Sequence, residues 1–145
     1  MIIIVSGNPA TGKTTIAKKL TEKKNLKYID VNKLIKENRL YSYYNKKDES
    51  YVVDVKKLNK FLISLIKKEK SIVLDSHLTH YLPRKYVDEC IITKCNLKEL
   101  KKRLEKRKYP REKIKNNLEC EIMNVCYNEA VENGHNVKVV DTSKN

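Results

Sequence analysis

The feature that most constrains this 145-residue chain is a phosphate-binding pattern close to its N-terminus. Gly7-x-x-x-x-Gly12-Lys13-Thr14 fills every fixed position of the P-loop, whose two glycines let backbone N–H groups wrap around phosphate. In such a loop the lysine reaches the β and γ phosphates, and the threonine hydroxyl holds Mg²⁺. Because glycine makes up only about 7% of average sequences, the pattern arises by chance in under about 1% of chains this long. The sequence therefore predicts a nucleotide-phosphate site.

The segments on both sides of this loop have the character that a P-loop requires. Residues 2–5 are all apolar and β-branched, which is typical of a strand buried on both faces of a parallel sheet. After the loop, Ile16, Ala17 and Leu20 recur at helical spacing. Further along, strand-like runs alternate with helical patterns, which predicts an α/β fold with a parallel sheet.

The rest of the chain divides into short apolar strands and amphipathic helices. Strands are predicted over residues 27–31, 71–75, 89–93 and 137–140, and helices over 31–38, 55–68 and from 97 onward. A long helix is expected to end near Glu132, and its inner face is predicted to carry Ile114, Leu118, Ile122 and Val125. Residues 41–50 are polar and rich in tyrosine, and they are predicted to form a loop or a mobile module.

A carboxylate at the end of a buried strand is the second chemical feature. Asp75 ends the run Ser-Ile-Val-Leu-Asp, where a P-loop protein places the carboxylate that holds Mg²⁺. The alternative is an ordinary strand-end or helix-capping aspartate, and the presence of the P-loop favours the metal role. His77 is a candidate to orient a water or to contact the transferred phosphate, although a single histidine is more often structural. The pair His77 and His80 offers too few ligands for a metal site.

Arginines are concentrated in one part of this lysine-rich chain. Three of the five, Arg103, Arg107 and Arg111, lie within nine positions. Phosphoryl transfer needs cations around the migrating charge, and arginine offers a bidentate fork that lysine lacks. The alternative is a solvated basic helix face.

The net charge of +14, from 32 Lys and Arg against 18 Asp and Glu, favours polyanionic partners, although a lysine-rich solvated surface explains most of it. No apolar run approaches the roughly 18 residues needed to span a bilayer, so no membrane partner is expected. Residues 1–5 lack the basic leader of a signal peptide. A cytoplasmic protein with its four cysteines as reduced thiols is therefore predicted.

The order of these motifs resembles the adenylate kinase isoenzyme 6 family, adenylate-kinase-like P-loop ATPases of archaea and eukaryotic nuclei. The resemblance is carried by the P-loop GNPATGKTT, by the segment 26–41, by the strand IVLDSHLTH, and by the segment 100–126. It implies the nucleoside monophosphate kinase fold, a five-stranded parallel sheet flanked by helices, in one domain over residues 1–145. A monophosphate-binding module is then expected near 31–54 and a short lid near 106–116.

The resemblance also implies site residues. ATP is expected on the P-loop, at Gly7, Ala10, Gly12, Lys13, Thr14 and Thr15. Thr14 and Asp75 would hold Mg²⁺, and Asp75 and His77 would form the Walker-B pair. Arg107 would be the lid arginine at the ATP phosphates. Lys108 departs from the pattern, since the lid often has glycine there. The family also continues past residue 145 with a final helix, so one sheet face is expected to be less covered.

Three functions remain open on the sequence. The resemblance implies adenylate kinase and ATPase activity with AMP as acceptor, together with a role in small-ribosomal-subunit maturation through a platform ribosomal protein and pre-rRNA. The alternative is an ATPase assembly factor in which phosphoryl transfer is incidental. It is favoured by the basic charge and by tyrosines able to stack on bases: Tyr41, Tyr43, Tyr44 and Tyr51. A small-metabolite kinase, such as a shikimate- or gluconate-type enzyme, is a second alternative on the same architecture.

Overall fold

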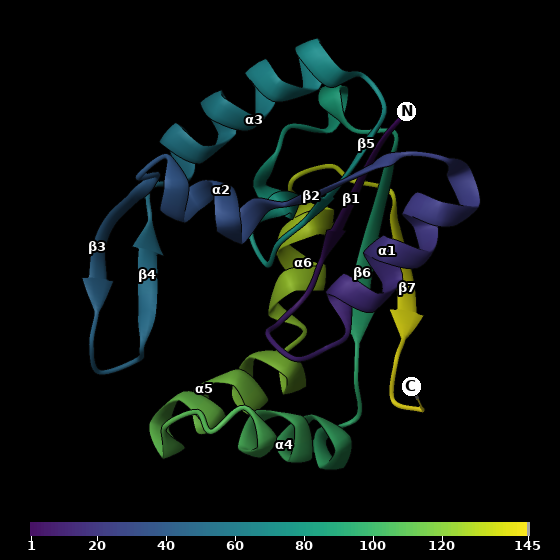
Figure 1. The fold of residues 1–145 in the computed structure, drawn as a ribbon. Helices are drawn as coiled ribbons and strands as arrows, with labels where there is room; N and C mark the ends of the chain where they lie inside the picture. Colours follow the sequence, from purple (N-terminus) through teal and green to yellow (C-terminus); the bar gives the residue numbers. More distant parts are fainter. Residues whose placement is uncertain (145) are drawn as a thin grey trace.

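The central sheet has five parallel strands in the order β2-β5-β1-β6-β7, in a computed structural model that describes residues 1–144 (Figure 1). These strands are β1 (Ile2–Ser6), β2 (Lys27–Asp30), β5 (Ile72–Asp75), β6 (Glu89–Lys94) and β7 (Val137–Asp141). The first strand lies in the middle, between β5 and β6, and Val5 is in register with Asp75. The P-loop therefore leaves the sheet beside the predicted Walker-B carboxylate.

Helices cover both faces of the sheet, and the alternation of side chains along β1 shows how. Ile3 and Val5 pack with Ala17 of α1 (Lys13–Lys24) on one face. Ile2 and Ile4 belong to the cluster on the other face, built with α2 (Val31–Glu37), α3 (Val55–Glu69) and α6 (Val125–Glu132). All five β1 side chains are buried, as expected for a strand with covered faces. The predicted fold class is confirmed.

A further pair of helices lies beyond the carboxyl ends of the strands (Figure 1). These helices are α4 (Leu97–Lys106) and α5 (Arg111–Ile122). Leu100 and Leu104 of α4 are fully buried and form a cluster with Ala10 of the P-loop. The pair is thus anchored on the phosphate loop itself. The 3₁₀ helices η1 (Thr79–Tyr81) and η2 (Arg84–Tyr86) connect β5 to β6.

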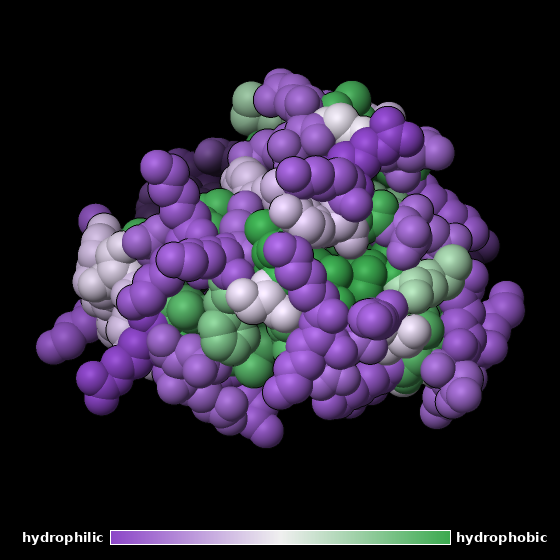
Figure 2. All heavy atoms as spheres, turned by 90° about the horizontal axis from the view of Figure 1, so that it is seen from above, coloured by the Kyte–Doolittle hydropathy of each residue, from purple (hydrophilic) through white to green (hydrophobic). Residues whose placement is uncertain are grey.

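The surface agrees with the high charge of the chain. Seen from above, hydrophilic side chains cover most of one face and surround a hydrophobic area in its middle (Figure 2). Within residues 1–144, no helix is both long enough and apolar enough to cross a membrane.

The prediction of a loop over residues 41–50 is wrong. The structure has an antiparallel hairpin there, formed by β3 (Tyr41–Asn45) and β4 (Ser50–Val53). Tyr44 faces Tyr51 across the hairpin, with ring centroids 5.0 Å apart, and Tyr41 lies 4.5 Å from the same ring. Such cross-strand aromatic pairs stabilise a hairpin without the apolar–polar alternation by which strands are usually found in sequence.

The long helix expected to reach Glu132 is also wrong, because it is broken into α5 and α6. Asn124 adopts the left-handed conformation, with φ of 52°, which asparagine tolerates better than most residues. Ile122, at the end of α5, has 60% of its surface exposed, so it does not belong to the inner face that the helical pattern predicted. The predicted apolar face therefore does not continue from α5 into α6.

Lys108 provides a stability test of the turn between α4 and α5. It has φ of 59°, and its N–H donates to Glu105 O where a helix usually ends with glycine. We expect K108G to raise the free energy of unfolding by about 0.5–1 kcal/mol, since glycine adopts this conformation without steric cost.

Chemical denaturation measures this change. The matched control is K106G in the last turn of α4, which should lower stability by about 1 kcal/mol because glycine is a poor helix former. Equal destabilisation by both variants would contradict the role assigned to the turn.

Candidate nucleotide site at the P-loop

The phosphate loop connects β1 to α1 and is held close to the ends of two other strands. Gly7 has φ of 149°, and a Cβ atom there would lie 2.4 Å from Thr93 Oγ1 at the end of β6. Gly12 has φ of 87°, and a Cβ atom there would lie 3.0 Å from Thr142, just after β7. Ala10 also has a positive φ, of 67°. Both glycines are therefore required by backbone conformation and by space.

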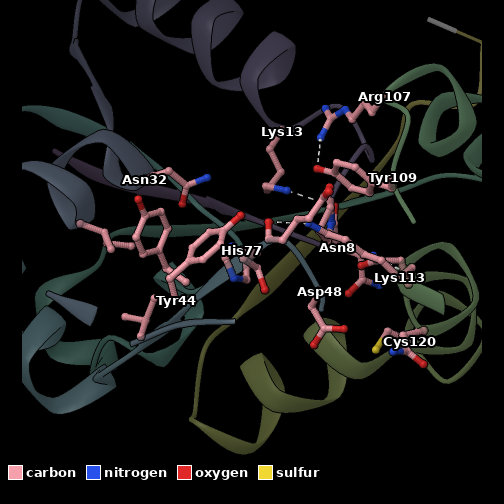
Figure 3. A pocket seen from close by; sticks show the side chains of 18 of the residues that line it. Asn8, Lys13, Asn32, Tyr44, Asp48, His77, Arg107, Tyr109, Lys113 and Cys120 are labelled. Atoms are coloured by element: carbon pink, nitrogen blue, oxygen red, sulfur yellow. Dashed lines mark hydrogen bonds between the residues drawn. The ribbon is translucent and has the colours of Figure 1, made fainter. Parts of the chain in front are cut away.

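Lys13 lies folded over its own loop. Its Nζ donates to Asn8 O at 3.0 Å, and the side chain points into the cavity described below (Figure 3). Burial lowers the pKa of Lys13 to about 8, and the nearby Asp75 carboxylate acts in the opposite direction. An anion at this position would stabilise the charged ammonium.

The two predicted metal ligands lie next to each other. Thr14 Oγ1 donates to Asp75 Oδ2 at 2.8 Å, across 61 positions of sequence. Tyr28 OH donates to the same carboxylate oxygen at 2.7 Å. Burial, together with this hydrogen bond, raises the pKa of Tyr28. Sequence reasoning missed this tyrosine. The pairing of β2 with β5 brings Tyr28 to Asp75, and no pattern in the sequence indicates how these two strands align.

The two histidines after β5 differ in their surroundings. His77 lines the cavity, and burial, followed by the charge of Lys13, lowers its pKa to about 4. His80 is 1% exposed; its Nδ1 shares a hydrogen bond with Ser6 Oγ (2.7 Å) and its Nε2 one with Glu129 Oε1 (3.1 Å). His77 is thus available to a ligand as a neutral imidazole, whereas His80 ties β1 to α6.

A cavity of about 830 Å³ opens in front of the loop, and Figure 3 shows the side chains that line it. One side is formed by the loop and the strand ends, through Asn8, Lys13 and His77. The opposite side is formed by α2 and the hairpin, through residues that include Asn32, Lys36, Tyr44 and Tyr51. The segment from α4 to α5 contributes Arg107, Tyr109, Lys113, Asn116, Asn117 and Cys120.

The arginine cluster does not act as one group. Arg107 lines the cavity, and its Nη1 donates to Tyr109 OH at 3.3 Å. Arg103 instead donates to Ala10 O at 3.2 Å and to Thr142 Oγ1 at 3.0 Å, which fastens the loop to the end of the described chain. Arg111 begins α5 and is exposed outside the set of lining residues. Only Arg107 of the three faces the cavity.

The last P-loop residues lie at the start of the helix that follows the loop, as expected. Thr15 lies in the first turn of α1 and is exposed, as is Thr14. Cys120 lines the cavity and is only partly buried, whereas Cys126 is 7% exposed.

Comparisons with known proteins find relatives along most of the chain. The family model described as "AAA domain" matches residues 3–124. A protein of Methanocaldococcus jannaschii named "Putative adenylate kinase" is 40% identical over 126 residues, covering 87% of this chain and 70% of that protein. A protein of Dictyostelium discoideum named "Adenylate kinase isoenzyme 6 homolog" is 34% identical over 128 residues, covering 88% and 73%.

Solved structures with a similar fold include two shikimate kinases. That of Aquifex aeolicus has a TM-score of 0.63 at 14% identity, covering 100% of this chain and 88% of that one. That of Acinetobacter baumannii, in complex with shikimate, has a TM-score of 0.69 at 14% identity, covering 99% and 84%. At this identity the likeness shows the fold alone.

The sheet order, the complete P-loop after β1 and the carboxylate at the end of β5 define a P-loop fold. With relatives at 34–40% identity that are named adenylate kinases, the chain is a P-loop kinase, an enzyme that transfers a phosphoryl group. Within this class, the chain belongs to the family of adenylate kinase isoenzyme 6 and its archaeal relatives.

The buried histidine makes stability depend on pH. Burial lowers the pKa of His80, so the folded chain keeps it neutral while the unfolded chain takes up a proton near pH 6.5. We therefore expect the free energy of unfolding to fall as the pH drops below about 6.5. Urea unfolding of wild type and H80Q between pH 8 and 5 measures the effect. The variant should show a smaller fall over this range, and identical pH dependence would contradict the assignment.

Proposed function

We propose that the chain is a Mg-ATP-dependent nucleoside monophosphate kinase that prefers AMP. The observation that carries this proposal is that Lys13 of the P-loop and Tyr44 and Tyr51 of the hairpin line one continuous cavity. A donor phosphate on the loop and an acceptor against the hairpin would then face each other across it. The names of the relatives, which describe adenylate kinases, support the same acceptor.

The donor end of the cavity offers positioning and charge, which are the main demands of phosphoryl transfer. Lys13 and Arg107 would neutralise charge on the transferred group, and Ala10, Gly12 and Thr15 would offer backbone N–H groups to the phosphates. Thr14 Oγ1 and Asp75 Oδ2 are oxygen ligands of the kind that Mg²⁺ prefers, and their separation of 2.8 Å fits one shared site. When bound there, Mg²⁺ neutralises charge on the β and γ phosphate oxygens. His77, neutral near pH 7, would orient the phosphate or a water by hydrogen bonding.

The acceptor end combines aromatic surfaces with a cation. Tyr44 and Tyr51 line it from the hairpin, and Lys36 Nζ lies 5.8 Å from the centroid of the Tyr51 ring. The rings can stack on a base, and the lysine can pair with a monophosphate. Residues 31–54 would thus serve as the monophosphate-binding module, and residues 106–116 as the lid, with Lys113 Nζ donating to Glu49 O at 3.2 Å between them.

A second candidate is an ATPase that assists small-ribosomal-subunit maturation through a ribosomal protein and pre-rRNA. Tyr43 favours it, because 58% of its surface is exposed on a hairpin of a chain with net charge +14. Exposed tyrosines on a basic surface suit single-stranded RNA. Binding to RNA should then weaken steeply with salt, because it depends on phosphate contacts. A third candidate, a small-metabolite kinase, is separated from the first two by a panel of acceptors.

Following the label from γ-labelled ATP tests the proposal. The protein is incubated with Mg²⁺ and labelled ATP, with and without AMP, and the products are separated. We expect label in ADP only when AMP is present, because the acceptor end must be occupied. Label appearing only as free phosphate in both reactions would overturn the kinase proposal in favour of the ATPase.

Lys13 should be essential for turnover. We expect K13A to lower kcat/KM for ATP at least about a hundredfold, the scale seen when one preorganised charge-stabilising group is removed. The matched control is K19A, which removes an exposed lysine from the opposite part of the same helix. Full turnover by K13A would contradict the site.

Arg107 should require its guanidinium fork rather than its charge alone. We expect R107K to lower kcat about tenfold or more, because lysine keeps the charge but loses bidentate geometry. R84K, at an exposed arginine of η2 outside the cavity, should behave as wild type. Initial-rate kinetics with both variants measure the difference, and equal rates would remove Arg107 from the site.

A further inference from the structure

A buried carboxylate behind the P-loop has no part in the chemistry proposed above. Glu121 lies in the last turn of α5, with 6% of its surface exposed. Its Oε1 accepts from Asn8 Nδ2 at 2.9 Å, and its Oε2 accepts from the backbone N–H of Cys95 at 2.8 Å. Both donors are neutral. Burying a charge costs free energy that well-packed apolar side chains avoid, so the carboxylate calls for an explanation.

Asn8 links this carboxylate to the phosphate-binding groups. Its backbone carbonyl accepts from Lys13 Nζ at 3.0 Å and from Thr11 Oγ1 at 2.6 Å. Its side chain is oriented by the hydrogen bond to Glu121, and a carboxylate is a stronger acceptor than a neutral oxygen. The position of Glu121 is therefore transmitted to Lys13 through a single residue.

Asn8 is held from both sides of the break between α5 and α6. Glu121 precedes the break at Asn124, and Cys126 follows it; Cys126 Sγ donates to Asn8 Oδ1 at 3.5 Å. The same helix α5 carries Lys113, Asn116 and Asn117 along the cavity. The arrangement of α5 and the shape of the phosphate loop are thus fixed by the same contact.

We propose that Glu121 is a positioning residue for ATP binding: through Asn8 it holds the phosphate loop, and with it Lys13, against α5. The inference rests on ATP binding at the P-loop, which is part of the proposed function.

Exchange of the two partners gives a sharp test, because these hydrogen bonds have a direction. In E121Q, the amide oxygen can accept from only one of the two donors, the Asn8 amide and the Cys95 N–H. The amide NH₂ then faces the other donor and has no acceptor. In N8D, two buried carboxylates face each other. In the double variant N8D/E121Q, the new amide NH₂ donates to the new carboxylate, and the amide oxygen accepts from the Cys95 N–H. The net charge and the number of hydrogen bonds match wild type.

Calorimetric titration with Mg-ATP measures affinity without turnover. We expect E121Q and N8D to bind about tenfold or more weakly than wild type, the scale of one buried hydrogen bond lost. The double exchange should bind more tightly than N8D, because it restores both hydrogen bonds while the residue at position 8 is the same. The matched control E119Q, an exposed glutamate on the same helix, should bind as wild type. In kinetics, KM for ATP should rise in E121Q while KM for AMP changes little, a split that general loss of stability does not produce.

Equal affinity for ATP in E121Q and E119Q would overturn the proposal, and so would a double variant that binds ATP no more tightly than N8D. If E121Q does not fold, N8A tests the same link. It removes the Asn8 amide, while Glu121 keeps its hydrogen bond from the Cys95 N–H. Wild type that binds Mg-ATP but does not phosphorylate AMP would contradict only the kinase. Wild type that binds no Mg-ATP would overturn both.

Discussion

The site depends on one constraint, the close approach of the phosphate loop to the ends of β6 and β7. Thr142 Oγ1 donates to Thr11 O at 2.6 Å across 131 positions of sequence, and Arg103 joins Thr142 to the carbonyl of Ala10. On its other side, the loop meets α5 and α6 through Asn8. A loop held by contacts this distant in sequence takes its shape only when the whole sheet is assembled. The shape of the loop is therefore a property of the fold, not of the local pattern alone.

Sequence reasoning located the parts of the site whose signals are local. The P-loop is a contiguous pattern, and Asp75 follows an apolar run, so the pairing of Thr14 with Asp75 could be expected from parallel strands lying side by side. Tyr28 and Glu121 could not be found in this way. Tyr28 reaches Asp75 through strand register, and Glu121 reaches Asn8 from 113 positions away, so neither leaves a pattern in its own neighbourhood.

The two errors of element prediction have different physical causes. Residues 41–53 pair through tyrosine rings. Their polar composition lacks the hydrophobic alternation from which strands are predicted, so the sequence did not indicate this hairpin. In the segment after Arg111, the apolar spacing was helical, but one asparagine in the left-handed conformation divides the predicted helix into α5 and α6. Conformation at single positions depends on tertiary packing, which outweighs helix propensities of a few tenths of a kcal/mol. Both errors fall on segments that border the cavity.

One contact across the cavity is weak compared with those that hold the loop. Lys113 Nζ reaches Glu49 O at 3.2 Å in an exposed position, while the Asn8 and Thr142 hydrogen bonds are buried. An exposed hydrogen bond contributes less than a buried one, because water replaces it readily. Separating α5 from the hairpin therefore costs little, whereas displacing the phosphate loop breaks several buried contacts together. For the proposed nucleotide site, entry by movement between α5 and the hairpin, around a fixed phosphate loop, is the motion that these relative strengths favour.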